Sequence, residues 1–222
     1  MVLTVRYLAL SAVKLMRVFD LGCGPGRDLV SWGVTSSDKV VGLDIESGHV
    51  AAAQARFPQR VYLQGTGEQL PFADESFDRV ISNVALPYMN IPKTLSEIHR
   101  ILIPGGRVSL SLHPPSFTIA ELLHTALPKP IPTLFRLYVI ANGVLFHCTG
   151  TTVGSLTKRT ESFQTERGMR IALGRAGFSY LSFRRTTRGE VERFIVEARK
   201  GTSKDLPGGA VVPGSDSRGK AE

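Results

Sequence analysis

The sequence predicts an α/β protein: a mostly parallel seven-stranded sheet with helices on both faces and an antiparallel hairpin at its end. Short apolar runs alternate with helix-forming or loop-forming stretches in the first half, which is typical of parallel strands joined by helices. After residue 113 the alternation of strand-like and helix-like runs stops, which predicts an inserted helical element. Two strand-like runs near the end of the domain predict the hairpin. The expected parallel strands are RVFDLG, KVVGLDI, RVYLQG, FDRVISNV and GRVSLSLH.

Two stretches between these runs are expected to be helices. GHVAAAQARF is rich in alanine, which favours helix. In IPKTLSEIHRIL, Pro92 fits the first turn, while Leu95, Ile98 and Leu102 fall on one face. ESFQTERGMRIALGRAGF predicts a further helix, and the runs SYLSFRR and VERFIVEAR, joined by TTRGE, predict the hairpin.

The chain divides into three expected parts. Residues 1–15 form a short lead-in segment, 16–200 a single domain, and 201–222 a tail with little to bury that is expected to be disordered. Within the domain, residues 114–160 carry several prolines and two apolar segments. This insertion is expected to be largely helical, to sit over the sheet and to lie on the substrate side of the site.

Composition limits the function classes. Hydrophobic residues make up 42% and charged residues 21%, which is ordinary globular usage. The two cysteines match no metal spacing and no disulfide framework, so we expect no bound metal and a reducing, cytoplasmic compartment. The net charge of +8 is concentrated in residues 117–222, which hold 16 Lys/Arg against 9 Asp/Glu. This basic half favours a solvated basic surface over a nucleic-acid interface.

The first chemical signal is the stretch VFDLGCGPGRD at residues 18–28. Gly22, Gly24 and Gly26 follow a strand directly, and glycine lets a loop bend tightly and bring its backbone close to a ligand. Asp44 ends the second strand, where a carboxylate can accept hydrogen bonds from both ribose hydroxyls. Ligands of open α/β sheets bind at these strand ends. The glycine loop after the first strand and Asp44 after the second therefore together predict a nucleoside cofactor.

Details of the loop select among nucleoside cofactors. The dinucleotide fingerprint places a third glycine at the sixth position, where this chain has Arg27. Asp20, just before the loop, would repel a pyrophosphate and suits a cationic ligand. A cofactor that carries a sulfonium and an amino group fits better, and a hydride-transferring dehydrogenase is the least favoured class.

VFDLGCGPG resembles the first motif of class I S-adenosylmethionine-dependent methyltransferases, whose fold is Rossmann-like. The likeness continues through VVGLDI, GTGEQLPFADESFDRVISNVALPYM and EIHRILIPGGRVSLSL, and covers residues 16 to 113. The resemblance is strongest to the group that includes the ubiquinone and menaquinone biosynthesis enzymes. Four motifs in the family's order and spacing make the resemblance specific.

The resemblance implies a set of cofactor-binding residues. Asp20 would orient the methionine amino group above a floor of glycines, and Asp44 would hold the ribose. Thr66 stands where the family usually has an aspartate, which makes it a weaker partner for the adenine amine. The implied set is Asp20, Gly22, Gly24, Gly26, Asp44, Ile45, Thr66, Gly67, Glu68 and Asn83.

Catalytic residues are harder to predict, because methyl transfer mainly needs alignment of acceptor and methyl and exclusion of water. His113, at the end of the fifth strand, and Tyr88, after the fourth, are the best-placed candidates for a base or a substrate contact. His124 and His147 lie in the insertion and could line a pocket. Of the others, His49 and His99 are expected on the surface of sheet-covering helices.

The sequence leaves several functions open. The first is methyl transfer to oxygen or carbon of a small molecule, which would be lipophilic if the apolar insertion lines the pocket. A basic rim from Arg136, Lys158 and Arg159 would then favour an anionic head group or a peripheral contact with a membrane surface. The second is an RNA or protein methyltransferase, although no recognition module is evident. A non-catalytic or degenerate S-adenosylmethionine-binding protein is the third, favoured by Thr66 and the short N-terminus.

Overall fold

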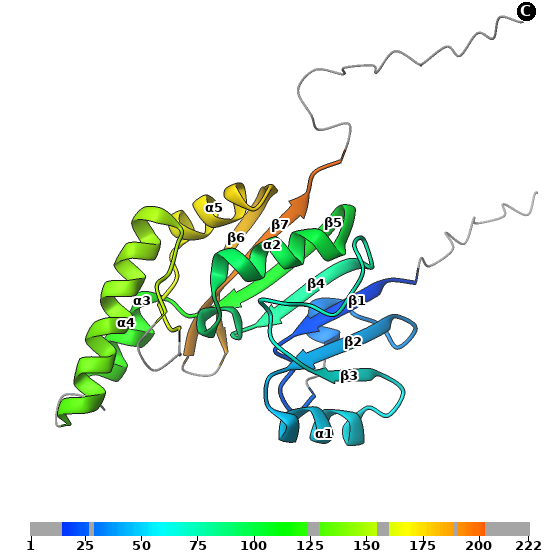
Figure 1. The fold of residues 1–222 in the computed structure, drawn as a ribbon, viewed down its shortest axis with the longest axis horizontal. Coiled ribbons are helices and arrows are strands. Elements are labelled where there is room, and N and C mark those ends of the chain that lie inside the picture. The colour runs from blue at the N-terminus through cyan, green and yellow to red at the C-terminus, as the bar shows by residue number, and fades with distance from the viewer. Residues whose placement is uncertain (1–14, 27–28, 124–128, 155–159, 189–190, 203–222) are drawn as a thin grey trace, which may run out of the picture.

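A computed structural model describes residues 15–26, 29–123, 129–154, 160–188 and 191–202, so most of the expected tail and most of the lead-in segment lie outside the described residues. Seven strands form one sheet in the order β3-β2-β1-β4-β5-β7-β6 (Figure 1). The strands are β1 Arg17–Leu21, β2 Lys39–Asp44, β3 Val61–Gln64, β4 Phe77–Asn83, β5 Leu102–Leu112, β6 Phe178–Arg188 and β7 Val191–Lys200. The helices are α1 Ser47–Arg56, α2 Ile91–Ile101, α3 Pro115–Glu121, α4 Pro130–Thr149 and α5 Glu166–Arg175, with 3-10 turns η1 Val30–Trp32 and η2 Leu86–Tyr88.

The strand order creates a switch point between β1 and β4. The chain runs outward from β1 to β3 and then returns to β4 on the other side of β1, and these pairs and β4–β5 are parallel. Only β7 and β6 join antiparallel. Connections that leave in opposite directions open a crevice at the carboxyl ends of β1 and β4. The predicted fold is confirmed, and the crevice lies where the glycine loop begins.

One face of the sheet is covered by α2 and α5 (Figure 1). Alternate residues of β5, Val108, Leu110 and Leu112, are fully buried against this layer. The opposite face is covered near β3 by α1 and near β1 by η1, as the smaller apolar clusters there show. Both faces therefore carry helical cover, as predicted, but the large core lies on one side.

Local capping sets where the helices of the larger layer begin. The Asn90 side chain accepts a hydrogen bond from the Lys93 N–H (3.2 Å) at the start of α2. The Thr165 hydroxyl accepts one from the Gly168 N–H (3.2 Å) at the start of α5. The predicted helix from residue 161 therefore begins later, because Thr165 is an N-cap, a position that favours threonine.

The insertion is helical as predicted, but it does not lie over the sheet. Figure 1 shows α3 and α4 beyond the carboxyl ends of the parallel strands, with α4 packed on α5. The packing is tight: a Cβ on Gly143 would lie within 2.5 Å of the Phe163 ring, and one on Gly168 would overlap Phe146. Phe146 reaches the main core from this side.

Most of α4 faces away from the protein. Among the described residues it is the one helix long and apolar enough to cross a membrane, judged by length and composition. Only 22% of its apolar window is buried. Ile131 (81% exposed) and Leu134 (71% exposed) lie near its N-terminal end. The side chains of these two residues reach solvent, and neither lines the main cavity.

Candidate functional site

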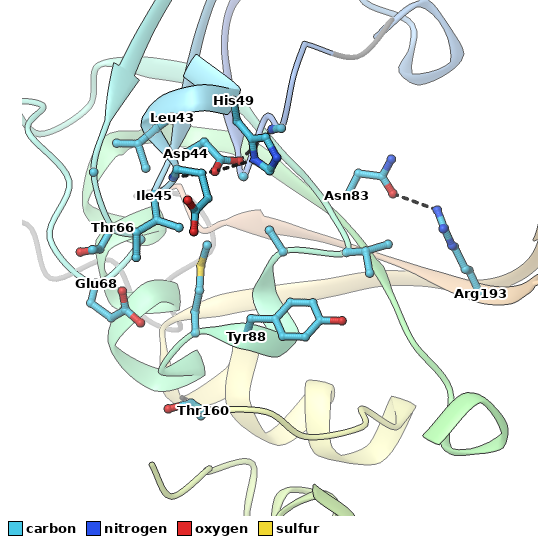
Figure 2. Close-up of a pocket in the computed structure, with 18 residues that line it drawn as sticks. Leu43, Asp44, Ile45, His49, Thr66, Glu68, Asn83, Tyr88, Thr160 and Arg193 are labelled. Carbon is cyan, nitrogen blue, oxygen red and sulfur yellow. Dashed lines mark hydrogen bonds and ion pairs between the residues drawn. The ribbon is translucent and has the colours of Figure 1, made fainter. Parts of the chain in front are cut away.

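A cavity of about 640 Å³ opens at the switch point, within the usual size range of small-molecule sites (Figure 2). It gathers eight of the ten predicted cofactor residues, together with the catalytic candidate Tyr88. Those eight are Gly22, Gly24, Asp44, Ile45, Thr66, Gly67, Glu68 and Asn83. The other lining residues are Leu43, Glu46, His49, Gly65, Val84, Ala85, Met89, Thr160 and Arg193.

Two of the three loop glycines face the cavity. Gly22 has φ +71°, and a Cβ there would lie 2.1 Å from the Ala85 Cβ, so only glycine lets the two loops meet. Gly24 lines the cavity beside it and donates its N–H to Asp44 Oδ2 (2.8 Å). Gly26 does not line the cavity: a Cβ there would press against Ala53 of α1. The predicted glycine floor is therefore Gly22 and Gly24, and Gly26 serves helix packing.

Asp44 is buried and already organised by the protein. Its Oδ1 accepts hydrogen bonds from the Glu46 N–H (3.0 Å) and lies 3.2 Å from His49 Nδ1 (Figure 2). An ionised carboxylate has about four lone-pair sites, so capacity remains for a ligand hydroxyl. His49 lies on the surface, as expected, but it also lines the cavity, because α1 begins right after β2 and places its first turn against Asp44.

The segment after β3 lines the cavity from a third side. It faces Ile45, which directly follows β2, is 63% exposed and supplies an apolar surface suited to the face of a planar base. Gly67 approaches Met89 so closely that a Cβ would lie 2.7 Å from its sulfur. Glu68 Oε1 accepts a hydrogen bond from the Asn90 N–H (2.8 Å), which ties this segment to the start of α2.

Strained backbone marks the end of β4. Val84 has φ +67°, a conformation that a β-branched residue rarely adopts. Its N–H donates to the Ser111 carbonyl of β5 (2.9 Å), which helps to hold the strain in place. Asn83, Val84 and Ala85 all line the cavity. Strain of this kind clusters where a fold presents groups to a ligand.

Asp20 is buried under the loop and does not line the cavity. Burial, followed by the charges of Asp20 and Asp44, raises the pKa of the neighbouring Cys23 thiol to about 12. Cys23 is therefore a protonated, unreactive thiol, in line with the small-residue role that its position in the loop suggests.

The two catalytic candidates lie in different surroundings. Tyr88 lines the cavity and is 51% exposed. Burial and the carboxylates of Glu161 and Glu121 raise its pKa, so the phenol is protonated at neutral pH. His113 is buried, stacked on Phe117 with ring centroids 4.2 Å apart, and is not among the lining residues. Burial and the nearby Arg193 lower its pKa to about 4, so its imidazole is neutral.

The remaining histidines lie away from the cavity. His147, in the last turn of α4, contacts the Thr165 hydroxyl (2.9 Å) at the start of α5, and His124 lies outside the described residues. His99 is partly buried, edge-on to Phe178, and burial lowers its pKa. It is therefore a packing residue rather than a surface one.

The expected basic rim is not formed by Arg136. Its guanidinium pairs with Glu121 (3.1 Å) and Glu161 (2.6 Å), which leaves the cluster with a net negative charge. Lys158 and Arg159 lie outside the described residues. The cation at the cavity is instead Arg193 of β7, which sequence reasoning missed because it follows the glycine loop by more than 160 positions.

Comparison with known proteins finds a family that part of the chain resembles. Residues 19–110 match the family model described as a methyltransferase domain. Residues 19–110 of this chain are therefore similar to a methyltransferase domain. The predicted resemblance is confirmed over these residues, and S-adenosylmethionine is confirmed as the cofactor of this class of domain.

Curated relatives and solved structures agree with this assignment. An uncharacterized methyltransferase of Synechocystis is 40% identical over 45% of this chain and 49% of that protein. The demethylmenaquinone methyltransferase of Renibacterium salmoninarum is 35% identical over 60% of this chain and 52% of that protein. The chain thus spans about half the length of the curated relatives it matches. A Methanosarcina mazei S-adenosylmethionine-dependent methyltransferase has the same fold (TM-score 0.59, 18% identity, covering 85% of this chain and 93% of that one).

The lining of the cavity suits S-adenosylmethionine. Asp44 supplies carboxylate oxygens for hydroxyl groups, Ile45 and Met89 supply apolar surfaces, and the close approach of Gly22 to Ala85 leaves room only for backbone. The described residues contain no cluster of three or more His, Cys, Asp or Glu side chains placed to hold a metal ion.

Proposed function

We propose that the chain transfers the methyl group of S-adenosylmethionine to an oxygen or carbon atom of a small, lipophilic molecule. The observation that carries this proposal is the division of one cavity into two ends. One end holds Asp44 and the glycine loop, and the other lies at η2 and the end of β4, with apolar lining from Val84 and the ring of Tyr88. An apolar lining with few polar groups is the usual environment of a lipophilic ligand.

The residues at the open end would position the acceptor. When bound, the cofactor supplies an already activated methyl group. Tyr88, with its protonated phenol, can donate a hydrogen bond to an acceptor oxygen and so fix its orientation. His113 stays outside this role, because the Phe117 ring covers it and it lacks a place on the lining. Alignment and the exclusion of water are the main requirements of this chemistry.

The names of relatives support a small acceptor. They include 2-phytyl-1,4-naphtoquinone methyltransferase of Thermosynechococcus vestitus, 32% identical over 55% of this chain, and the demethylmenaquinone enzyme. A malonyl-[acyl-carrier protein] O-methyltransferase of Erwinia billingiae is 36% identical over 43% of this chain. Both carbon and oxygen acceptors are therefore retained in the proposal.

Parallel titration of the purified chain with S-adenosylmethionine, S-adenosylhomocysteine and NADH tests the cofactor part. Micromolar binding of the two sulfur nucleosides, without NADH binding, supports the proposal. Transfer of a labelled methyl group to a panel of quinols, phenols and acyl carboxylates then tests the acceptor part. Absence of nucleoside binding would favour a non-catalytic or degenerate protein. Methyl transfer to RNA or protein alone would favour an RNA or protein methyltransferase.

We also propose that the α3–α4 face contacts a membrane surface from the cytoplasmic side. Ile131 and Leu134 project from the end of α4 beside the exposed Lys129, and apolar groups next to a cation favour insertion at an anionic lipid surface. Co-sedimentation with phosphatidylglycerol vesicles, compared with phosphatidylcholine vesicles, tests this contact. The double variant Ile131→Ser, Leu134→Ser should lose binding, whereas Val144→Ser, further along α4, should retain most of it.

A further inference from the structure

The insertion reaches the cavity through one side chain. Of the described part of the insertion, Thr160 alone lines the cavity. Figure 2 shows Thr160 on the same side as Tyr88 and away from Asp44, so it belongs to the acceptor end. It lies in the connection between α4 and α5, whose described parts, residues 150–154 and 160–165, contain no helix or strand. A residue outside regular structure needs supporting contacts to hold it at a site.

The Asn142 side chain of α4, 4% exposed, holds this connection at two points. Its Oδ1 accepts a hydrogen bond from the Val153 N–H (2.9 Å), and its Nδ2 donates to the Val153 carbonyl (3.2 Å). Nδ2 also donates to the carbonyl of Glu161 (2.9 Å), the residue next to Thr160. An amide side chain can accept and donate in this way. An apolar side chain in its place would leave the Glu161 carbonyl without this donor.

The position of the connection is felt at Tyr88. The Glu161 carboxylate, paired with Arg136 of α4 (2.6 Å), contributes after burial to the raised pKa of Tyr88. The hydrogen bonds of Asn142 act on the backbone of the same segment, which sets the position of Thr160. One helix therefore holds both the residue that lines the acceptor end and a charge that acts on its phenol.

We propose that Asn142 is a positioning residue for the methyl acceptor: its buried amide holds the α4–α5 connection so that Thr160 forms part of the acceptor end beside Tyr88. This role rests on the proposed transfer to a small acceptor. Asn142 is not among the lining residues, so it acts through Thr160 rather than by touching a ligand. Cofactor affinity should not depend on it, because Asp44 and the glycine loop lie on other elements.

Asn142→Leu tests this role, because leucine fills a similar volume without hydrogen bonds. The acceptor is the most rapidly methylated member of the panel of quinols, phenols and acyl carboxylates. Its KM should rise about tenfold or more, while the affinity for S-adenosylhomocysteine stays within about twofold. Asn142→Gln, which keeps the amide on a longer side chain, should fall between the wild type and Asn142→Leu. Ile98→Val is the control for lost stability: Ile98 is fully buried on α2, outside the cavity lining, and both values should stay unchanged.

Titration of Tyr88 gives a readout that needs no acceptor. NMR of ring-labelled tyrosine, with Tyr88→Phe identifying the signal, measures the pKa of the phenol. This pKa should lie above 10.0 in the wild type and fall toward that value in Asn142→Leu, because the Glu161 carboxylate moves away and water enters. Tyr138→Phe removes a hydrogen bond to the Val153 carbonyl (2.6 Å) but keeps Asn142, so it should retain the wild-type pKa.

The two readouts separate this role from the proposed function. If the wild-type chain methylates no member of the panel, the proposed function fails, and the Tyr88 titration still decides the role of Asn142. An unchanged pKa of Tyr88 in Asn142→Leu would overturn the inference. Equal losses of cofactor affinity and acceptor KM would overturn it too, because they indicate a general loss of structure. If Asn142→Leu fails to fold, Asn142→Gln is judged by the same two measurements.

Discussion

The cofactor end and the acceptor end of the cavity are built in different ways. At the cofactor end, Gly22 and Gly24 follow the first strand and Asp44 ends the second, within 23 positions of one another, and a 2.8 Å hydrogen bond joins Gly24 to Asp44. At the acceptor end, Tyr88, Thr160 and Arg193 come from η2, the loop before α5 and β7. The cofactor end is formed by residues close together in the sequence, whereas the acceptor end depends on packing between segments that are far apart in the sequence. We therefore expect cofactor binding to be lost when a side chain is added at the glycine loop. We expect methyl transfer to slow when a single contact at the acceptor end is removed.

The largest effect is expected from Gly22→Ala. Its Cβ would lie 2.1 Å from the Ala85 Cβ, and φ is +71°. Strain and overlap together should lower the free energy of unfolding by roughly 2–5 kcal/mol and abolish measurable cofactor binding. Urea unfolding and S-adenosylhomocysteine titration measure both. Gly48→Ala, where a Cβ meets nothing within 4 Å, is the control and should retain binding.

Asp44→Asn should weaken S-adenosylhomocysteine about 30- to 100-fold, because charge-assisted hydrogen bonds to the ribose become neutral ones. Isothermal titration at neutral pH gives the affinities. Asp38→Asn is a matched control: Asp38 also accepts backbone hydrogen bonds, from Met16 (2.9 Å) and Thr35 (2.8 Å), but lies away from the cavity. A larger loss for the Asp38 variant would contradict the ribose site.

His113 should affect stability rather than cofactor affinity. Its pKa is about 4 in the folded protein and 6.5 in the unfolded chain, so the unfolded state binds more protons between these values. The free energy of unfolding should fall by roughly 2–3 kcal/mol as pH drops from 6.5 to 4. This part of the slope should disappear in His113→Gln, measured by urea unfolding at several pH values.

His99 also has a lowered pKa and contributes a slope of the same sign. The variant His99→Gln separates the two contributions. An unchanged pH slope in His113→Gln would show that His113 is solvated, and it would reopen its candidacy as a base at the acceptor end.

The smallest effect is expected from Tyr88→Phe. The phenol lies at the acceptor end, so S-adenosylhomocysteine should bind within about twofold of the wild-type affinity, while transfer to the identified acceptor should slow by about tenfold or more. Titration measures the affinity for S-adenosylhomocysteine, and a labelled-methyl assay measures transfer to the acceptor, so the two ends are tested separately. A tenfold loss of nucleoside affinity would mean that the two ends are not independent.

The sequence by itself determined the sheet and the cofactor end. Parallel strands bring their carboxyl ends to one edge, so the glycine loop and Asp44 had to meet once the alternation of strands and helices was recognised. The same periodicity predicted α1, α2 and the β6–β7 hairpin close to their observed bounds. These features depend on contacts between segments that follow one another along the chain.

Only the tertiary structure decided the remaining features. Gly26 fills a packing position against Ala53, although its spacing is the same as that of the other loop glycines. His49 reaches Asp44 because α1 begins directly after β2, and Arg193 reaches Asn83 because β7 inserts next to β5. In the insertion, apolar residues of α4 such as Ile131 and Leu134 face solvent. Hydrophobic periodicity in the sequence does not distinguish such an exposed apolar face from one that packs in the core. Side-chain direction and strand order, not residue type, decided these placements.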